Sequence, residues 1–430
     1  MMKDRVLIIG ATGYLGRRLV KTSLALGFPT YCLYRPEVAS DAEKVQMLIE
    51  FKLQGAHLLK GSFEDHESLL SALKQVDVVI SAVAGNHFRH AILEQLKLIK
   101  AIKEVGTIKR FFPSEFGMDV DRMEHAIDPG AYVFADKRVI RRAVEKENIP
   151  YTYVSANCCA GYFTASLVQV CNFMPPTDNV VIYGKGDKKC IWNDEDDMAM
   201  YTMMAVDDPR TLNKTLYIRP PGNIMTQMEV VKIWEKLIGK ELKKTFLSQE
   251  EWLGTMDKVP RPVQIGVAHL YQIFFRGDLE FEIEGPHGVD SNDLYPEHKY
   301  VTVEEYLKRI WNDEDDMAMY TMMAVDDPRT LNKTLYIHPP GNIMTQMEVV
   351  KIWEKLIGKE LKKIFLSQEE WLGTMDKVPR PVQIGVAHLY QIFFRGDLEF
   401  DIEGPHGVDS NDLYPEHKYV TVEEYLKRFA

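Results

Sequence analysis

The sequence predicts an α/β fold. We expect a Rossmann-type doubly wound parallel sheet, a smaller mixed α/β region after it, and a duplicated copy of that C-terminal region. Three observations lead to this prediction. Short apolar runs alternate with helical patterns over residues 1–190, as in βαβ units. A glycine-rich turn follows the first apolar run, and residues 191–309 recur almost unchanged at 310–428.

The first 190 residues supply the elements of the sheet. Val6–Ile9 is a short buried-strand pattern, and the helix after the glycine-rich turn should end near Leu26, with Gly27 as its C-cap. Further strands are expected at Thr30–Tyr34, His57–Leu59, Val78–Ser81, Arg110–Phe112 and Tyr151–Ser155, and further helices at Glu67–Lys74, Ile92–Glu104 and Val133–Glu147.

Each copy of the repeat should be mixed α/β. Asn193 is predicted to cap a helix with an acidic first turn, followed by a strand at Lys214–Ile218 and helices at Gln227–Leu237 and Pro262–Phe274. The acidic runs at 193–197 and 312–316 resemble carboxylate metal ligands, but they lack the glycine and spacing of a calcium loop. We therefore interpret both runs as capped helix starts and predict no metal site.

The repeat defines three segments: 1–190, 191–309 and 310–430. The two copies differ only at Arg219/His338, Thr245/Ile364 and Glu282/Asp401. Such near-identity indicates either a recent duplication or an error in assembling the gene. The second copy has no counterpart of the glycine-rich turn, so it cannot form a second active site. We expect one intact unit at 1–309 and an appended segment without a partner core.

Composition restricts the class of protein. The 430 residues are 46% hydrophobic and 27% charged with a net charge of −11, which is typical of a globular protein. No basic run suggests nucleic acid, and no apolar stretch is long enough to span a membrane. The first residues do not form a signal-peptide pattern, and the five cysteines match no zinc or redox motif. We expect a cytoplasmic protein.

The glycine-rich turn has the sequence GATGYLG and comprises Gly10, Ala11, Thr12, Gly13, Tyr14, Leu15 and Gly16. It follows a predicted strand and opens a predicted helix. Glycines there allow a tight turn and close approach of a pyrophosphate, which the helix N-terminus favours. The spacing G-x-x-G-x-x-G differs from G-x-G-x-x-G. The alternative is a glycine-rich turn without a ligand.

Two cations favour NADP over NAD. Enzymes that use NAD tend to have an acid at the end of the second strand, where this chain has Arg35. Lys44 lies on the next helical segment. Arginine offers a planar fork of donors to the 2′-phosphate. The alternative is that both residues are solvated surface charges.

Lys137 is the candidate catalytic residue. Tyr132 precedes it by five residues, which places the two side chains on different faces of a helix, so they are not the usual Tyr-x-x-x-Lys pair. A lysine partly desolvated beside a cofactor can have a lowered pKa and act as a general base. The alternative for a lone helix lysine is a solvated charge.

These residues belong to stretches that resemble a plant family of atypical, NmrA-like short-chain reductases, which act on lignans, phenylcoumarans and isoflavones. The matching stretches include VLIIGATGYLGRRLV, VDVVISA, IKRFFPSEFGMD, DKRVIRRAVE and IPYTYVSANCCAGYF. They cover residues 1–309. Within the family, ISAVAGNHFRHAILEQLKL, EFGMDVDRMEHA and HLYQIFFRG are most similar to the pinoresinol–lariciresinol reductases.

The resemblance implies an activity and further site residues. Lys137 would deprotonate a substrate phenol, a benzylic C–O bond would open to a quinone methide, and NADPH would deliver hydride. Arg141 would contact the cofactor. His269, Phe163 and the Tyr153–Asn157 turn would lie near the substrate, and His388 duplicates His269. Relatives suggest a homodimer. The remaining alternatives are a reductase of phenylcoumarans or isoflavones, a non-catalytic NADP(H)-sensing regulator, and an inactive product of the duplication.

Overall fold

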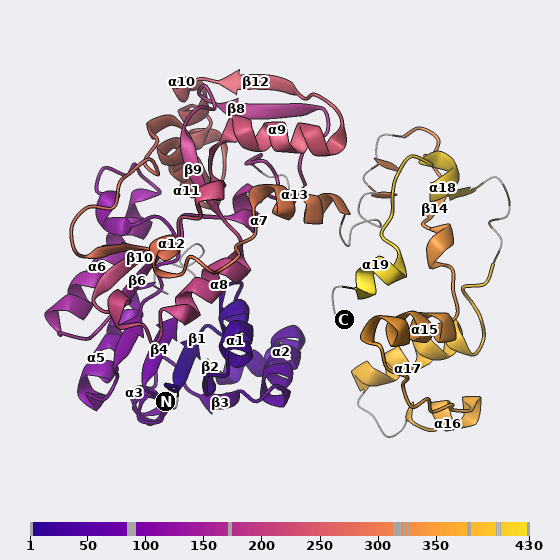
Figure 1. Cartoon of the computed structure of the whole chain (residues 1–430), viewed down its shortest axis with the longest axis horizontal. Helices are drawn as coiled ribbons and strands as arrows, with labels where there is room; N and C mark the ends of the chain where they lie inside the picture. The colour runs from indigo at the N-terminus through magenta and orange to yellow at the C-terminus, as the bar shows by residue number, and fades with distance from the viewer. Residues whose placement is uncertain are drawn as a thin grey trace. The chain divides into compact units, whose positions relative to one another are not determined.

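The computed structural model describes residues 3–427, except 84–91, 171–173, 313–319, 322, 325–326, 376–379, 401, 403 and 405. The chain divides into two compact units, Met1–Leu307 and Lys308–Ala430, which are coloured indigo to orange and orange to yellow in Figure 1. Each unit is described by itself. Residues 313–316 of the second acidic run and part of the matched stretch around residues 84–91 lie outside the described residues.

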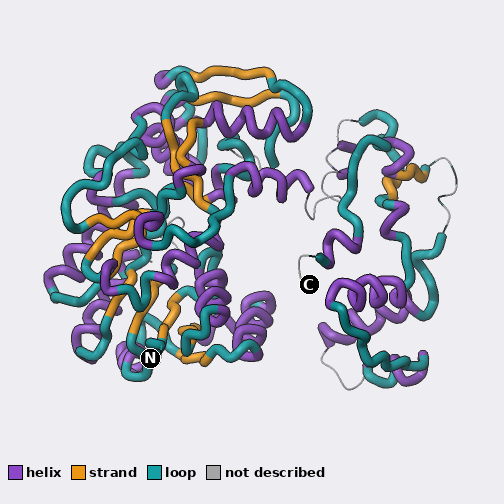
Figure 2. The backbone as a smooth tube through the Cα atoms, in the orientation of Figure 1, coloured by secondary structure: helices purple, strands orange, loops and turns teal. Residues whose placement is uncertain are grey.

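A five-stranded parallel sheet forms the centre of the first unit (Figure 2). Its strands are β1 (Val6–Ile9), β2 (Thr30–Tyr34), β3 (His57–Lys60), β4 (Val78–Ser81) and β5 (Arg110–Phe112). Their order is β3-β2-β1-β4-β5, which confirms the doubly wound prediction. The order reverses between β1 and β4. In open α/β sheets, ligands bind in the crevice beyond the carboxyl ends of the strands at this point.

Helices cover both faces of this sheet because each has one apolar side. One buried cluster joins the sheet to α1 (Gly16–Ala25), α2 (Ala42–Leu53) and α8 (Glu195–Met204). A second cluster joins it to α3 (His66–Leu73), α5 (Gln95–Val105) and α6 (Ala131–Lys146). Since α8 belongs to the first copy of the repeat, that copy supplies part of the core under the glycine-rich turn.

Three smaller sheets join the first half of the chain to the first copy. Strand β6 (Thr152–Ser155) pairs with β10 (Lys214–Tyr217), which also pairs with β13 (Gly288–Asp290). Strand β9 (Lys189–Asn193) lies between β7 (Cys158–Cys159) and β11 (Ile224–Thr226), and β8 (Asn179–Tyr183) pairs with β12 (Lys243–Leu247).

The other helices are α7 (Ala160–Phe163), α9 (Gln227–Ile238), α10 (Gln249–Leu253), α11 (Arg261–Tyr271), α12 (Ser291–Leu294) and α13 (Val303–Asn312). Short 3₁₀ turns are η1 (Pro36–Ser40), η2 (Val120–Arg122), η3 (Pro209–Thr211), η4 (Pro221–Asn223) and η5 (Met256–Lys258).

Two sequence-based predictions in the first copy need correction. Asp194, and not Asn193, caps α8, since its carboxylate accepts from the amides of Asp196 and Asp197. The Asn193 amide instead donates to the carbonyl oxygens of Ala156 and Ile218, which fixes the end of β9. The predicted helix at 262–274 is α-helical only to Tyr271 and continues as a π-helical turn, η6, over Gln272–Arg276.

The second unit repeats these elements without their partners. It contains β14 (Thr334–Tyr336), η7 (Pro340–Asn342), α15 (Gln346–Ile357), α16 (Gln368–Leu372), α17 (Arg380–Phe393), β15 (Gly407–Asp409), α18 (Ser410–Leu413) and α19 (Val422–Leu426). Helices α9 and α15 have the same sequence, yet α9 buries Val230, Val231 and Trp234 and α15 buries no residue. Likewise Leu279 is 2% exposed and its counterpart Leu398 is 61% exposed.

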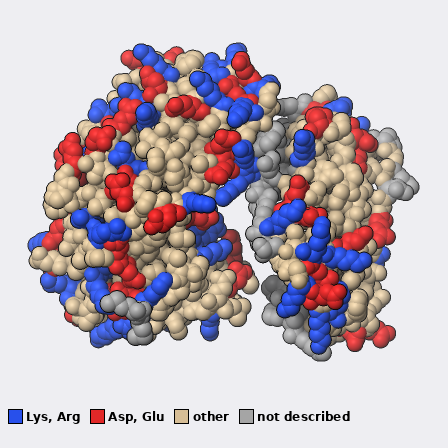
Figure 3. All heavy atoms as spheres, viewed as in Figure 1, with Lys and Arg blue, Asp and Glu red and all other residues tan. Residues whose placement is uncertain are grey.

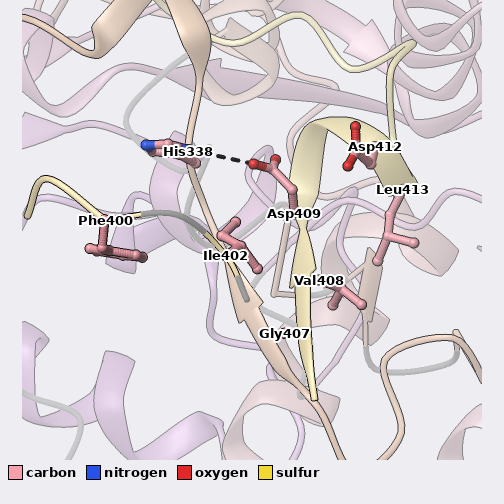
Figure 4. A pocket seen from close by; sticks show the side chains of 8 residues that line it. All are labelled: His338, Phe400, Ile402, Gly407, Val408, Asp409, Asp412 and Leu413. Carbon is pink, nitrogen blue, oxygen red and sulfur yellow. Dashed lines mark ion pairs between the residues drawn. The ribbon is translucent and has the colours of Figure 1, made fainter. Parts of the chain in front are cut away.

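The second unit contains a cavity of about 390 Å³ (Figure 4). His338, Phe400 and Asp409 are among its lining residues, and His338 lies 3.5 Å from the Asp409 carboxylate. In the first unit the counterpart ring, Phe281, is flanked by the guanidinium of Arg122, 4.2 Å from its centroid. The second copy has no counterpart of Arg122, and the cavity contains no counterpart of the candidate site residues.

Two further features concern the charged surface and the hydropathy of the helices. On the face drawn in Figure 3, basic and acidic side chains are interspersed over both units. Among the described residues, no helix is both long enough and apolar enough to cross a membrane.

Candidate active site

The glycine-rich turn connects β1 to α1 at the point where the strand order reverses. Gly10 has a φ of +83°, and a Cβ there would lie 2.6 Å from the carbonyl oxygen of Ala82 after β4. A Cβ on Gly16 would lie 1.9 Å from the Gly10 carbonyl oxygen, and one on Gly13 3.1 Å from it. The turn therefore needs glycine at Gly10 and Gly16. The first amides of a helix have no intrahelical partner, so this geometry suits an anionic ligand.

The other residues of the turn divide between core and surface. Ala11 is buried and Leu15 packs against the same apolar cluster, while Thr12 is half-buried. Only the backbone of Ala11 and Leu15 is therefore available to a ligand. The Tyr14 side chain points elsewhere, because its hydroxyl donates to the Glu195 carboxylate at 2.8 Å.

Arg35 and Lys44 differ in their availability to a phosphate. Arg35 is exposed immediately after β2, which pairs with β1 and so ends at the same sheet edge. Lys44 is in the first turn of α2, and its ammonium pairs with Asp41 at 2.5 Å. The role of Arg35 as an NADP-binding cation stays a prediction, and a phosphate would compete with Asp41 for Lys44.

Lys137 lies in the middle of α6, facing the segment after β5. Its ammonium donates to the carbonyl oxygen of Glu115 at 2.6 Å. Burial lowers the pKa of Lys137; the Glu115 carboxylate opposes this shift, and the charge of Arg141 adds to it. A lowered pKa suits a general base, and the catalytic role of Lys137 stays a prediction.

Arg141, one turn after Lys137, is enclosed by carboxylates. Its guanidinium is 2% exposed and binds Glu115 and Asp119 at 2.7 Å each and Asp121 at 3.0 Å. The ring of Tyr153 packs on it, with 4.4 Å from the guanidinium carbon to the ring centroid. In this arrangement Arg141 holds the segment that carries Glu115. The predicted cofactor contact of Arg141 stays a prediction, and these carboxylates would have to release donors for it.

His269 on α11 lies against the start of α6. Its ring centroid is 5.0 Å from that of Phe134, and a Cβ on Gly130 would lie 2.9 Å from its Cδ2. Burial lowers the pKa of His269 to about 4, with a smaller contribution from Lys137. Its Nε2 is buried without a well-formed hydrogen bond among the described residues. The main chain of Gly130 also acts on the His269 ring and raises its pKa, which opposes burial. A neutral imidazole beside the Lys137 helix can bind a polar substrate group.

The last predicted substrate-side residues are Phe163 and the turn at the end of β6. Phe163 is half-buried at the end of α7. Asn157, at a φ of +55°, donates from its side chain to Ile218 and from its main chain to Gly117. These bonds join the turn at 153–157 to the segment that follows β5. The duplicate His388 is on α17 of the second unit, which has no counterpart of Lys137.

Two carboxylates in this site are not evident from the sequence alone. The Glu115 carboxylate binds Arg141, and the Glu115 carbonyl oxygen accepts a hydrogen bond from Lys137. Glu195 binds both Tyr14 and the amide of Gly161. Burial raises the pKa of the nearby Cys159 thiol; the charge of Glu195 adds to this shift and that of Lys137 opposes it. The sequence shows these residues only as acids in a loop and in a helix start.

The carboxylates of the first acidic run bind protein donors. Asp194 caps α8, Glu195 accepts from Tyr14 and Gly161, and Asp197 accepts from His298 and Val301. This arrangement agrees with their interpretation as a helix start and adds contacts to other elements. Among the described residues, no group of three or more such side chains is arranged to hold a metal ion.

Comparison with known proteins identifies the family. The sequence profile of the NmrA-like family matches residues 2–307 and, separately, residues 308–426. The chain belongs to the NmrA-like family. The two matches agree with the duplication seen in the sequence.

Curated relatives match this chain over nearly their own whole length. Bifunctional pinoresinol-lariciresinol reductase 2 of Thuja plicata is 60% identical over 307 residues, covering 71% of this chain and 98% of the relative. The bifunctional pinoresinol-lariciresinol reductase of Linum album is 55% identical over 308 residues, 71% of this chain and 94% of the relative. An isoflavone reductase homolog of Lupinus albus is 52% identical over 310 residues, 72% and 99% of the two chains.

Solved structures of NmrA-like proteins have the same fold. AtPrR2 with NADP⁺ and (+)pinoresinol superposes with a TM-score of 0.69 at 51% identity, covering 72% of this chain and 99% of that one. Leucoanthocyanidin reductase of Vitis vinifera with NADPH has a TM-score of 0.65 at 37% identity, covering 71% and 99%. The family relationship therefore extends over the first unit, including the turn and α6.

Proposed function

We propose that this chain is an NADPH-dependent reductase that opens the benzylic ethers of plant lignans, with pinoresinol and lariciresinol as substrates. The observation that carries the proposal is the half-buried Lys137 on α6, whose ammonium donates to the Glu115 carbonyl oxygen, in a fold whose glycine-rich turn suits a dinucleotide. The relatives that span nearly the whole first unit are named as enzymes of this reaction. They support the lignan class over the regulator alternative.

The residues of the turn fit NADPH. Backbone atoms leave no room for a Cβ on Gly10 or Gly16, so glycine there allows the tight turn that brings the start of α1 to a pyrophosphate. Arg35 is exposed at the end of β2, where a 2′-phosphate would be recognised. When bound, NADPH supplies a hydride to the electrophilic carbon of the substrate.

Lys137 acts on the substrate phenol. Its neutral amine takes the phenolic proton, and the phenolate pushes an electron pair through the ring to break the benzylic C–O bond. The products of this step are a quinone methide and an alkoxide, which later takes up a proton. A phenol titrates at a pKa of about 10, so a lysine with a lowered pKa can exchange a proton with it near neutral pH.

His269 and Phe163 bind and orient the substrate in this proposal. His269 is neutral at neutral pH, since burial lowers its pKa to about 4, so it forms a hydrogen bond without adding charge. Phe163 offers an aromatic surface at the end of α7. His269 lies against Phe134 of α6, and α7, which ends at Phe163, contacts the glycine-rich turn through Tyr162.

We also propose the domain arrangement. Residues 1–190 bind the cofactor, residues 191–309 complete the reductase, and 310–430 is an appended copy. Cys190 supports this assignment of the copies. It is fully buried, with its Sγ 3.0 Å from that of Cys158. The residue before the second copy is Arg309, and docking of that copy in the same place would bury a guanidinium beside Cys158.

Two finer proposals rest on the resemblance and on composition. We propose a homodimer, tested by light scattering coupled to size-exclusion chromatography. We propose a cytoplasmic location, tested by microscopy of a fluorescent fusion. A monomer in the first experiment, or a fusion in another compartment in the second, would reject the corresponding proposal.

Turnover with defined substrates tests the proposed activity. Purified protein and NADPH are mixed with pinoresinol, with a phenylcoumaran or with an isoflavone, and products are separated by chromatography. We expect lariciresinol or secoisolariciresinol from pinoresinol and slower or no reaction with the others. Faster reduction of a phenylcoumaran or isoflavone would favour those sibling activities, and nucleotide binding without any turnover would favour the regulator.

A further inference from the structure

Glu195 forms a contact that its position in a helix does not require. The capping role at the start of α8 belongs to Asp194. Glu195 is 2% exposed, and its Oε1 accepts hydrogen bonds from the Tyr14 hydroxyl and the Gly161 amide, each 2.8 Å long. Burying a carboxylate is unfavourable unless its hydrogen bonds offset the loss of water. The hydrogen bonds from Tyr14 and Gly161 therefore stabilise the buried position of Glu195.

The two donors belong to the two sides of the candidate site. Tyr14 is part of the glycine-rich turn, and Gly161 is in α7, two residues before Phe163. A Cβ on Gly161 would lie 2.2 Å from the Tyr14 hydroxyl oxygen. The turn and α7 are therefore in close contact, and one oxygen atom of Glu195 joins them.

The surroundings of Tyr14 restrict it to this position. Its ring packs edge-on against Tyr162, with centroids 5.3 Å apart. The Arg18 guanidinium also packs on the Tyr14 ring, with its carbon 4.5 Å from the ring centroid. Arg18 donates a hydrogen bond to the Tyr14 carbonyl oxygen at 2.8 Å. Arg18 also pairs with Asp196, next to Glu195, at 3.1 Å. The start of α8 thus contacts the turn through two adjacent side chains.

We propose that Glu195 is a positioning residue of the reductase: by binding Tyr14 and Gly161 with one oxygen, it fixes the cofactor turn relative to the α7 segment that carries Phe163. It acts through these two residues and does not touch the reacting atoms. The inference rests on the proposed function, since it concerns the same site. It also assigns a task to the first copy of the repeat, which provides Glu195, beyond completing the core.

The chemistry of the contact suggests a discriminating set of variants. Both hydrogen bonds end on the same oxygen, so Glu195→Gln keeps an acceptor for both of them. Glu195→Ala removes both, and Tyr14→Phe removes one while keeping the ring. Glu314 is the sequence counterpart of Glu195 in the second copy and lies outside the described residues. Because that copy has no glycine-rich turn, Glu314→Ala is a matched control in the same local sequence.

The experiment measures NADP⁺ binding to the full-length chain by fluorescence titration, together with kcat and KM for NADPH. Loss of a hydrogen bond to a charged group corresponds to roughly tenfold or more in an equilibrium constant. We expect Glu195→Ala to weaken NADP⁺ binding about tenfold and to lower kcat, with Tyr14→Phe intermediate. Glu195→Gln and Glu314→Ala should match the unmodified chain. Tyr14→Phe should have no further effect when Glu195 is already alanine.

Three results would overturn the proposal. They are unchanged NADP⁺ binding and kcat in Glu195→Ala, an effect of Tyr14→Phe that is the same with and without Glu195, and equal losses in Glu195→Ala and Glu314→Ala. If Glu195→Ala does not fold, Tyr14→Phe and Glu195→Gln decide, because the proposal requires weaker binding in the first and normal binding in the second. Nucleotide binding is measured without substrate, so a wrong lignan assignment would appear as missing turnover with these binding differences intact.

Discussion

The ammonium of Lys137 and the carbonyl oxygen of Glu115 are joined by a 2.6 Å hydrogen bond. This bond connects the middle of α6 to the segment after β5, while the Glu115 carboxylate binds Arg141 one turn further along the same helix. One residue thus orients the candidate base through its main chain and neutralises the neighbouring arginine through its side chain. The two functions explain why a lysine can remain desolvated beside a buried guanidinium.

Replacement of Lys137 should abolish chemistry without abolishing cofactor binding. We expect Lys137→Ala to lower kcat with pinoresinol by at least ~10²-fold, because general-base catalysis typically contributes this much. NADP⁺ affinity should stay close to that of the unmodified chain, since the turn and Arg35 are untouched. Single-turnover assays and fluorescence titration measure the two quantities. A Lys137→Ala enzyme with normal kcat would show that another group takes the proton.

Activity should rise with pH through the pKa of Lys137. Only the neutral amine can accept the phenolic proton, and burial lowers the pKa of Lys137 below that of a free lysine. The rising limb of kcat/KM should therefore lie at lower pH than an ordinary lysine would give. His269 adds no limb near neutrality, because its pKa is lowered to about 4. A profile measured between pH 5 and pH 10 that falls with rising pH would contradict this assignment.

Arg35 should determine the preference for NADPH over NADH. Arg35→Asp removes a cation from the end of β2 and introduces the acid that NAD-binding folds tend to have there. We expect the ratio of kcat/KM for NADPH to that for NADH to fall by ~10-fold or more, as for loss of a charge-assisted hydrogen bond. Lys44→Ala should have a smaller effect, since Lys44 already pairs with Asp41. An unchanged ratio in Arg35→Asp would place the 2′-phosphate elsewhere.

The space available to a Cβ differs between Gly16 and Gly266. A Cβ on Gly16 would lie 1.9 Å from the Gly10 carbonyl oxygen, whereas one on Gly266 in α11 meets nothing within 4 Å. Gly16→Ala should destabilise the chain by about 3 kcal/mol or prevent nucleotide binding. Gly266→Ala should be neutral or stabilise it by ~0.5–1 kcal/mol, as expected for an exposed helix position. Denaturant unfolding measures both, and a well-folded, nucleotide-binding Gly16→Ala variant would refute the turn geometry.

The second copy should be dispensable. We expect a chain that ends at residue 309 to have the same kcat as the full chain and to be more soluble, because Leu398 and Phe393 are exposed in the second unit, whereas their counterparts Leu279 and Phe274 are buried in the first. Limited proteolysis of the full chain should leave a stable fragment near residues 1–309. Uniform resistance of the whole chain, or loss of activity on truncation, would show that the second copy contributes to the fold.

Local sequence patterns predicted the parts of the fold that depend on neighbours in the chain. The strands from Val6–Ile9 to Arg110–Phe112 and the turn at Gly10–Gly16 follow from apolar runs and glycine spacing. The cap at Asp194 was missed by one residue, because Asn193 and Asp194 are both good N-caps. Only the tertiary fold shows that Asn193 is needed to bind Ala156 and Ile218.

Contacts between distant residues could not be predicted in this way. Glu195 and Tyr14 are separated by 181 positions, and the carboxylates around Arg141 come from a loop with no periodic pattern. The identical sequences of α9 and α15 make the same point, since burial of Trp234 depends on elements that the second copy does not have. The family resemblance raised Lys137 to the leading candidate, which its position in a helix alone did not do.

Hydride transfer from labelled cofactor tests the central claim most directly. The full chain is incubated with pinoresinol and NADPH carrying deuterium at the transferred position, and products are analysed by mass spectrometry. We predict lariciresinol or secoisolariciresinol with one deuterium for each ether opened, and no labelled product with Lys137→Ala. Unlabelled or absent product from a chain that binds NADPH and pinoresinol would contradict the assignment of this site as a reductase.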